Sequence, residues 1–204
     1  GAGKSTLVKL ICGFYVPTNG RVLVNGVDTR ELNLTEYFKH LSAVFQNEWI
    51  LSYTIAENVA MGKDWEKDRI WEALKLAKID SVVKALPNGI FTYLGKEIDQ
   101  NGVLLSGGEL QKLFWARALY RNPKLILLDE PTAALDALAE DQLYQAYHKM
   151  TEKKSAMFIS HRLASTRFCD TILMLENGKI VESGTHEELL AKKGSYAKLF
   201  EVQS

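Results

Sequence analysis

Cysteine is scarce in this sequence, and its scarcity bears on the cellular compartment. Only two cysteines occur among 204 residues, Cys12 and Cys169, and each lies in an apolar stretch. Two such residues favour buried free thiols in a reducing environment over a disulfide framework. Long apolar runs are also missing, since none approaches the roughly 20 residues that a membrane-spanning helix requires. A role at a membrane would therefore depend on a partner.

An excess of either charge is equally absent. Lys and Arg together number 25, and Asp and Glu also number 25, so no basic excess points to nucleic acid. Internal repeats and low-complexity segments are lacking as well. What is present is an ordinary globular composition, with 47% hydrophobic residues and 14 glycines, which suffices for a substantial core. The length fits one domain, or one domain of two lobes.

Hydrophobic patterns along the chain predict alternating strands and helices. Residues 125–128 are apolar without alternation, as in a strand buried on both faces of a parallel sheet. Residues 42–46 and 155–160 are further short strands, whereas residues 55–121 are helical in character, as are residues 136–150. Asn-Gly pairs predict hairpin turns at residues 19–20, 25–26 and 177–178. The pattern as a whole predicts an α/β fold of two lobes with a helical insertion.

The chain opens on GAGKST, which matches the end of the phosphate-loop pattern G-x-x-x-x-G-K-[ST]. Small residues let backbone N–H groups surround a phosphate, and the helix that follows adds its positive end. Lys4 would reach the β- and γ-phosphates of a nucleotide, and Ser5 would hold Mg²⁺. The alternative is a glycine turn that merely precedes a helix. The cradle itself would comprise Gly1, Ala2, Gly3, Lys4, Ser5 and Thr6.

Two adjacent acids follow the apolar strand in LILLDEP. Ligands of doubly wound sheets bind at the carboxyl ends of the strands, where Asp129 and Glu130 lie. Asp129 suits a Mg²⁺ shell, and Glu130 suits polarising a water for attack on the γ-phosphate. Carboxylates are also common at solvated strand ends, so the pair alone leaves both readings open.

The stretch LSGGE carries a second glycine-rich start of a helix. Ser106 and Glu109 form the S-x-x-E pattern of a capping box. Capping does not require Gly107 and Gly108, which are poor helix formers at roughly 1 kcal/mol each relative to Ala. Close approach of an anion to the backbone N–H groups would explain these two glycines.

In this order and at this spacing, the three motifs resemble the ABC transporter ATPase family over essentially the whole chain. Further positions match that family, and the resemblance implies their roles. Gln46 matches the Q-loop, which contacts Mg²⁺ and water and senses the membrane partner. Asp136, in AALD, matches the D-loop, and His161, in ISHRL, matches the switch histidine that contacts the γ-phosphate. Taken singly, these three could be a turn residue, a helix N-cap and a core histidine.

The resemblance implies a P-loop NTPase (RecA-like) core with an inserted α-helical subdomain and a small antiparallel β part. It implies one ABC ATPase domain over residues 1–204, with a RecA-like lobe at about 1–50 and 123–204 and a helical lobe at about 51–122. ATP and Mg²⁺ are the implied cofactors. Glu130, His161 and Gln46 would be catalytic, and Ser5, Gln46 and Asp129 would hold the metal. Nucleotide contacts would also come from Ser106, Gly107, Gly108 and Asp136, across a head-to-tail dimer with a second ATPase domain.

The segments LGKEIDQNGVLLSGGE and GTHEELL resemble the exporter branch of the family. We therefore expect an ATP hydrolase that drives export, at the cytoplasmic face of a membrane, with a transmembrane domain fused upstream and no nucleic-acid partner. The family alternatives are an importer ATPase and a soluble non-transport ABC ATPase. Two positions depart from the usual pattern: Glu109 stands where Gln is usual, and Ala134 where Ser is common. The resemblance further implies truncation within the phosphate loop, so that this piece alone would bind and hydrolyse ATP weakly.

Overall fold

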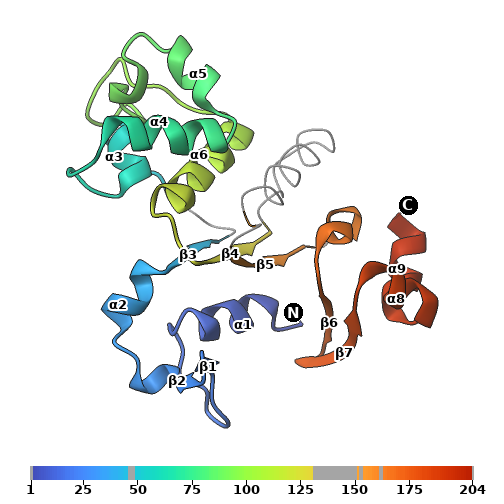
Figure 1. Ribbon diagram of the computed structural model, residues 1–204. Helices are drawn as coiled ribbons and strands as arrows, with labels where there is room; N and C mark the ends of the chain where they lie inside the picture. The colour runs from blue at the N-terminus through green and yellow to red at the C-terminus, as the bar shows by residue number, and fades with distance from the viewer. Residues whose placement is uncertain (1, 46–48, 131–150, 152–153, 161–162, 204) are drawn as a thin grey trace. The chain divides into compact units, whose positions relative to one another are not determined.

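The structure is a computed structural model that describes residues 2–45, 49–130, 151, 154–160 and 163–203 (Figure 1). The contacts divide the chain into two compact units. One unit combines Gly1–Tyr37 with Phe158–Ser204, and the other is the continuous stretch Phe38–Met157. The predicted helix at residues 136–150 lies outside the described residues.

A parallel strand pair forms the base of Phe38–Met157. Strands β3 (Leu41–Val44) and β4 (Leu125–Asp129) pair in parallel, and the sheet order is β3-β4-β5, where β5 is Ser155–Ile159. The β4 residues Ile126, Leu127 and Leu128 are 4%, 1% and 0% exposed. Side chains on both faces of β4 are thus buried, as the unbroken apolar run predicted.

Helices make up most of the remainder of this unit, and Figure 1 shows them grouped on one side of the strands. They are α3 (Ile55–Ala60), α4 (Lys67–Leu76), α5 (Asp80–Ala85), the 3-10 turn η2 (Gly89–Phe91) and α6 (Gly107–Tyr120). Both α3 and α4 pack against α6. The contact face of α4 is an apolar stripe at helical spacing, in which the buried residues are Ile70, Ala73, Leu74 and Ala77.

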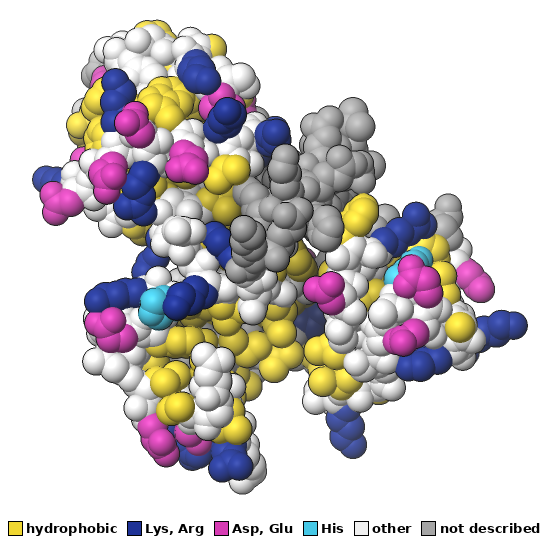
Figure 2. Space-filling model, in the orientation of Figure 1, with side chains coloured by type: hydrophobic (Ala, Val, Ile, Leu, Met, Phe, Trp, Pro, Cys, Tyr) yellow, Lys and Arg dark blue, Asp and Glu magenta, His cyan; other side chains and the backbone are white. Residues whose placement is uncertain are grey.

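The face of these helices shown in Figure 2 carries Lys and Arg side chains interspersed with Asp and Glu. Among these helices, Asp80 and Lys84 on α5 form an ion pair, with the ammonium 2.7 Å from the carboxylate. It holds the pKa of Asp80 below its ordinary value. The view agrees with the balanced charge of the sequence, since no single sign dominates this face.

The other unit begins with α1 (Lys4–Ile11) and a small antiparallel pair, β1 (Leu23–Val24) and β2 (Val27–Asp28). The β1–β2 turn is Asn25–Gly26, with φ of 50° and 83°, as expected of an Asn-Gly hairpin. The pair predicted at Asn19–Gly20 is wrong as a hairpin, because no strand precedes it in residues 12–22. The segment then continues into η1 (Thr29–Glu31) and α2 (Leu34–Lys39).

The carboxyl-terminal part of this unit is a hairpin followed by two helices. Strands β6 (Ile172–Glu176) and β7 (Lys179–Gly184) pair around the predicted Asn177–Gly178 turn. After them come α8 (His186–Lys192) and α9 (Ser195–Gln203), and the short η3 (Leu163–Phe168) precedes them. Their common core comprises Leu163, Ile172, Leu189 and Tyr196.

Both cysteines are free thiols, as predicted. Burial raises the pKa of the Cys12 thiol to about 11 and also raises the pKa of Cys169. Within the described ranges, no helix combines the length and the apolar character that crossing a membrane would require.

Candidate functional site

The start of α1 leaves backbone donors without a cap from a side chain. Gly3 is the N-cap, with φ 90° and ψ 10°, and no side chain donates or accepts a capping bond there. The first intrahelical bond on the Gly3 carbonyl comes from Leu7, at 3.0 Å. The amides of Lys4, Ser5 and Thr6 precede it and have no intrahelical acceptor. With no acid in the first turn, this end presents partial positive charge to an anion.

A second segment, distant in sequence, holds the front of this loop. The amide of Gly178, in the β6–β7 turn, donates to the carbonyl of Ala2 at 3.2 Å. A Cβ atom placed on Gly3 would lie 4.0 Å from the Gly178 Cα, so the two backbones pass close to each other. Sequence reasoning found the Asn177–Gly178 turn but did not place it beside the phosphate loop. No local signal could do so, because the contact is set by tertiary packing.

The end of β4 presents the two acids. Asp129 is 5% exposed and directly follows the buried Leu128. Glu130 adopts φ 53°, a left-handed conformation that non-glycine residues rarely take. Such backbone outliers cluster at active sites and ligand clamps. A hydroxyl and a carboxylate, such as those of Ser5 and Asp129, are hard oxygen donors and fit the chemistry that Mg²⁺ prefers.

The start of α6 is a complete capping box. The Ser106 hydroxyl accepts from the Glu109 amide at 3.4 Å, and the Glu109 carboxylate accepts from the Ser106 amide at 2.8 Å. The same carboxylate oxygen lies 2.8 Å from the Ser106 hydroxyl. Ser106 and Gly107 are exposed, and Gly108 is partly buried. The predicted cap is therefore confirmed, and it leaves the serine on the surface of this unit.

The structure gathers the predicted site residues into separate groups. Ala2, Gly3, Lys4, Ser5 and Thr6 lie together in one unit. Asp129 and Glu130 share the other unit with the Ser106–Gly108 loop. Gly1, Gln46, Asp136 and His161 lie outside the described residues, and their roles stay predictions.

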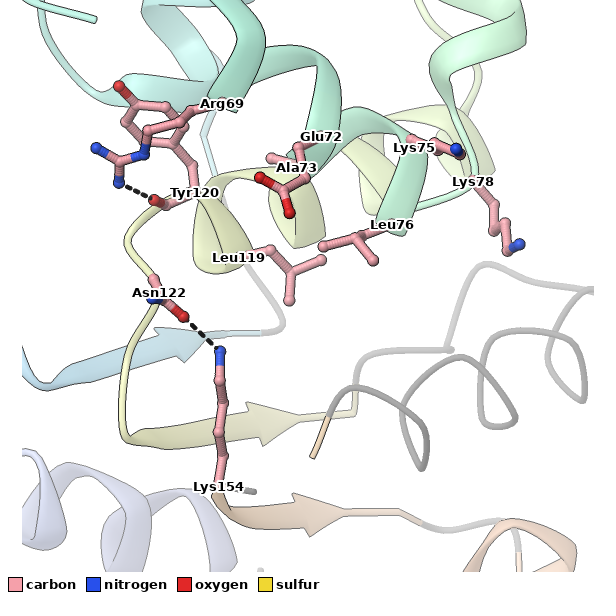
Figure 3. A pocket seen from close by; sticks show the side chains of 10 residues that line it. All are labelled: Arg69, Glu72, Ala73, Lys75, Leu76, Lys78, Leu119, Tyr120, Asn122 and Lys154. Carbon is pink, nitrogen blue, oxygen red and sulfur yellow. Dashed lines mark hydrogen bonds between the residues drawn. The ribbon is translucent and has the colours of Figure 1, made fainter. Parts of the chain in front are cut away.

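A pocket of about 750 Å³ in Phe38–Met157 lies between α4 and the end of α6 (Figure 3). The Arg69 guanidinium donates to the Tyr120 carbonyl there at 2.9 Å, and the Lys154 ammonium donates to the Asn122 side chain at 2.8 Å. None of the predicted site residues is among its described lining. The nucleotide site is therefore not assigned to this pocket.

Comparisons with known proteins agree with the motifs. The family model described as ABC transporter matches residues 1–133. ABC transporter B family member 13 of Arabidopsis thaliana is 41% identical over 204 residues, which are 100% of this chain and 16% of that protein. The ATP-dependent lipid A-core flippase of Chromohalobacter salexigens is also 41% identical over 204 residues, covering 100% of this chain and 34% of the flippase.

Solved structures give the same result for the fold. A bacterial Atm1-family ABC exporter with ATP bound superposes with a TM-score of 0.90 at 35% identity, covering 100% of this chain and 35% of the exporter. The chain thus spans about a third or less of the length of these relatives. The family model matches well over half of the chain, including the phosphate loop, the LSGGE loop and the LILLDEP strand. The chain belongs to the ABC transporter family, with the P-loop NTPase fold of an exporter ATP-binding domain.

Proposed function

We propose that this chain is the ATP-binding and ATP-hydrolysing part of an ABC exporter, and that it couples ATP-driven dimerisation and hydrolysis to transport. The observation that carries the proposal is the end of β4. A buried carboxylate, Asp129, is followed there by Glu130 in a strained backbone conformation. A conformation that costs about 1–3 kcal/mol persists only where the surrounding structure demands it. ATP hydrolysis needs a carboxylate at a fixed place, and this need is a reason for Glu130 to keep the strained conformation.

In this proposal, ATP binds at the start of α1. The uncapped amides of the first turn donate to phosphate oxygens, and the Lys4 ammonium neutralises the β- and γ-phosphates. Ser5 and Asp129, with Gln46, would hold Mg²⁺, and the bound ion would neutralise charge that develops on the phosphates. Glu130 then orients and polarises the attacking water, and His161 contacts the γ-phosphate.

A complete site requires a second copy or a related domain. Ser106, Gly107 and Gly108 lie at the start of α6, in a different unit of the chain from Lys4. In a two-fold arrangement, the LSGGE loop of one subunit, with Asp136, closes on ATP held by the other. ATP bound in this way favours the closed dimer, and hydrolysis releases it.

The partner in the membrane is a transmembrane domain, present in the same polypeptide or in another. We assign its contact to Phe38–Met157, where several large apolar side chains are exposed to solvent. The most exposed are Trp49 at 81%, Leu104 at 75%, Ile98 at 59%, Phe91 at 53% and Met61 at 51%. The cytoplasmic face of a membrane is the corresponding location.

Glu130→Gln in the complete gene product tests the enzymatic part. The amide keeps the shape of the side chain but cannot act as a base, so hydrolysis should fall by about 10²-fold or more. ATP affinity should stay within about twofold, because the phosphate contacts of the loop are retained. Phosphate release and equilibrium ATP binding are the two measurements. Near-normal turnover in this variant would remove Glu130 from the role of base.

A further inference from the structure

A fully buried asparagine anchors the segment that precedes α3. Asn58 is 0% exposed, and its side-chain oxygen accepts from the Leu51 amide at 2.9 Å. Its side-chain nitrogen donates to the carbonyls of Leu51 at 2.9 Å, Thr54 at 3.0 Å and Tyr53 at 3.3 Å. Together with the backbone bond from the Leu94 amide to the Tyr53 carbonyl, at 2.9 Å, this side chain holds the backbone over residues 51–54.

Arg117, on α6, extends this anchor to residue 49. Both of its terminal nitrogens lie 3.2 Å from the Trp49 carbonyl, and Nε donates to the Asn58 carbonyl at 3.0 Å. Nη2 also lies 3.4 Å from Oδ1 of Asn58. The guanidinium stacks over the Phe114 ring, 5.1 Å from its centroid. A planar fork suits this task, because it reaches two carbonyls at once.

Burial alone would not hold this segment. Trp49 is 81% exposed, Tyr53 is 45% exposed and Leu51 is 38% exposed, so these side chains contribute little core packing. Hydrogen bonds therefore hold this segment. Those to residues 51–54 come from Asn58, from the Leu94 amide and from the Ser52–Glu97 pair, and the bonds to the Trp49 carbonyl come from Arg117. We call Asn58, Arg117 and their bonds to residues 49–54 the clasp.

The clasp is attached to the helix that begins at the LSGGE loop. Arg117 lies about three turns along α6 from the N-cap Ser106, on a single continuous helix. Because a helix of this length is stiff, a displacement of Trp49 that the clasp transmits moves Ser106 as well. The described residues thus connect an exposed aromatic side chain to the start of α6 through one arginine.

We infer that Asn58 and Arg117 are positioning residues that couple the exposed face at Trp49 to the LSGGE loop. The inference rests on the proposed function, which gives the Trp49 face a membrane partner and gives Ser106 a contact with ATP. The two residues touch no nucleotide in this scheme. They act by keeping the backbone at Trp49 in a fixed position relative to the axis of α6.

Arg117→Lys in the complete gene product tests the clasp directly. Lysine keeps the charge but cannot bond the carbonyls of Trp49 and Asn58 together. Amide hydrogen exchange over residues 49–54 should accelerate by about tenfold or more as local opening becomes easier. ATP affinity should stay within about twofold, while kcat falls about tenfold, as misplacement remote from the chemistry produces.

Arg121→Lys is the matched control. Arg121 caps the same helix and donates to a backbone carbonyl, that of Phe38, at 2.9 Å. Exchange over residues 49–54 and kcat should both remain within about twofold of the unsubstituted protein. Unchanged exchange over 49–54 in Arg117→Lys would overturn the clasp. If Arg117→Lys does not fold, Asn58→Asp carries the same test, since it keeps the acceptor and removes the amide donors.

A double-mutant cycle separates coupling from general loss of structure. Trp49→Ala removes the exposed side chain but keeps the carbonyl that Arg117 bonds. If the clasp transmits the position of Trp49, the double variant should lie within about twofold of the worse single variant in kcat. Effects that multiply would overturn the coupling. If exchange accelerates in Arg117→Lys but the unsubstituted protein does not hydrolyse ATP, the proposed function and the coupling are both rejected. The hydrogen bonds of the clasp then remain as a structural feature only.

Discussion

Helices α1 and α6 both begin at glycine-rich turns, yet their first turns are completed in opposite ways. At α1, Gly3 is the N-cap, no side chain caps the helix and the first turn carries no acid. At α6, Ser106 and Glu109 cap each other's backbone amides in a full capping box. The first end leaves its donors for an external anion, whereas the second satisfies two of its donors, the amides of Ser106 and Glu109, and leaves those of Gly107 and Gly108 outside the box.

The difference indicates how each end is used. The start of α1 is suited to bind phosphate by itself, because among the described residues no side chain caps it and its first turn carries no acid. At the start of α6 the Ser106 hydroxyl and amide are already bonded to the Glu109 carboxylate, so an anion that reaches Ser106 must compete with that carboxylate. The start of α1 on one subunit thus binds phosphate directly, whereas the start of α6 on the other subunit binds it only in competition with Glu109. This combination suits a dimer that closes only when ATP is present.

The largest expected effect comes from removing the charge at the uncapped end. Lys4→Ala should weaken equilibrium ATP binding by about 10- to 100-fold, since hydrogen bonds to charged groups contribute about 1.5–3 kcal/mol. Lys9→Ala is the control on the same helix, because Lys9 lies in the last turn. Equal losses of ATP binding in the two variants would remove the distinction between the ends of α1.

Ser106→Ala should have a smaller effect, confined to association. It should leave ATP binding by the monomer intact and weaken ATP-driven dimerisation by about tenfold, as loss of one bond to a charged group would. Thr185→Ala is the matched control, because Thr185 and Glu188 form the same capping box at α8. Each alanine should lower the free energy of unfolding by about 1 kcal/mol, the usual value of an N-cap.

Sedimentation with and without ATP separates the two roles. Thr185→Ala should dimerise with ATP as the unsubstituted protein does, despite its equal loss of stability. If both variants lose dimerisation to the same extent, Ser106 acts only as a helix cap and the comparison of α1 with α6 fails.

Glu109→Gln gives the smallest effect and sharpens the comparison. Glutamine can keep the capping bonds, but it removes a negative charge from the helix start that an anion must approach. Charges at this position are worth about 0.3–1 kcal/mol, so ATP-driven dimerisation should tighten by about two- to fivefold. The gain should shrink as salt is added, because exposed charges are screened. A weaker dimer in this variant would show that the carboxylate assists closure.

Local features of the fold could be predicted from the sequence because their causes are local. The capping boxes at Ser106 and Thr185, the buried β4 strand and the Asn177–Gly178 turn follow from spacing and residue type. The Asn19–Gly20 prediction failed because an Asn-Gly pair forms a hairpin only where strands flank it on both sides.

Long-range contacts could not be predicted in this way. The helical character of residues 55–121 does not single out Arg117, whose partner Asn58 lies 59 residues away. The bond between Gly178 and Ala2 joins the β6–β7 turn to the phosphate loop, two segments far apart in the sequence. Such contacts depend on how separate elements pack, which periodicity and spacing do not specify.

The left-handed backbone at Glu130 sets activity against stability at a single position. Glycine adopts that conformation without steric penalty, and asparagine tolerates it better than most residues. A chain selected only for folding would therefore lose the carboxylate readily and gain stability when Glu130 is replaced by either one. Glutamate at this position therefore carries a steric cost that glycine would not, and replacing it would exchange the acid at the end of β4 for stability.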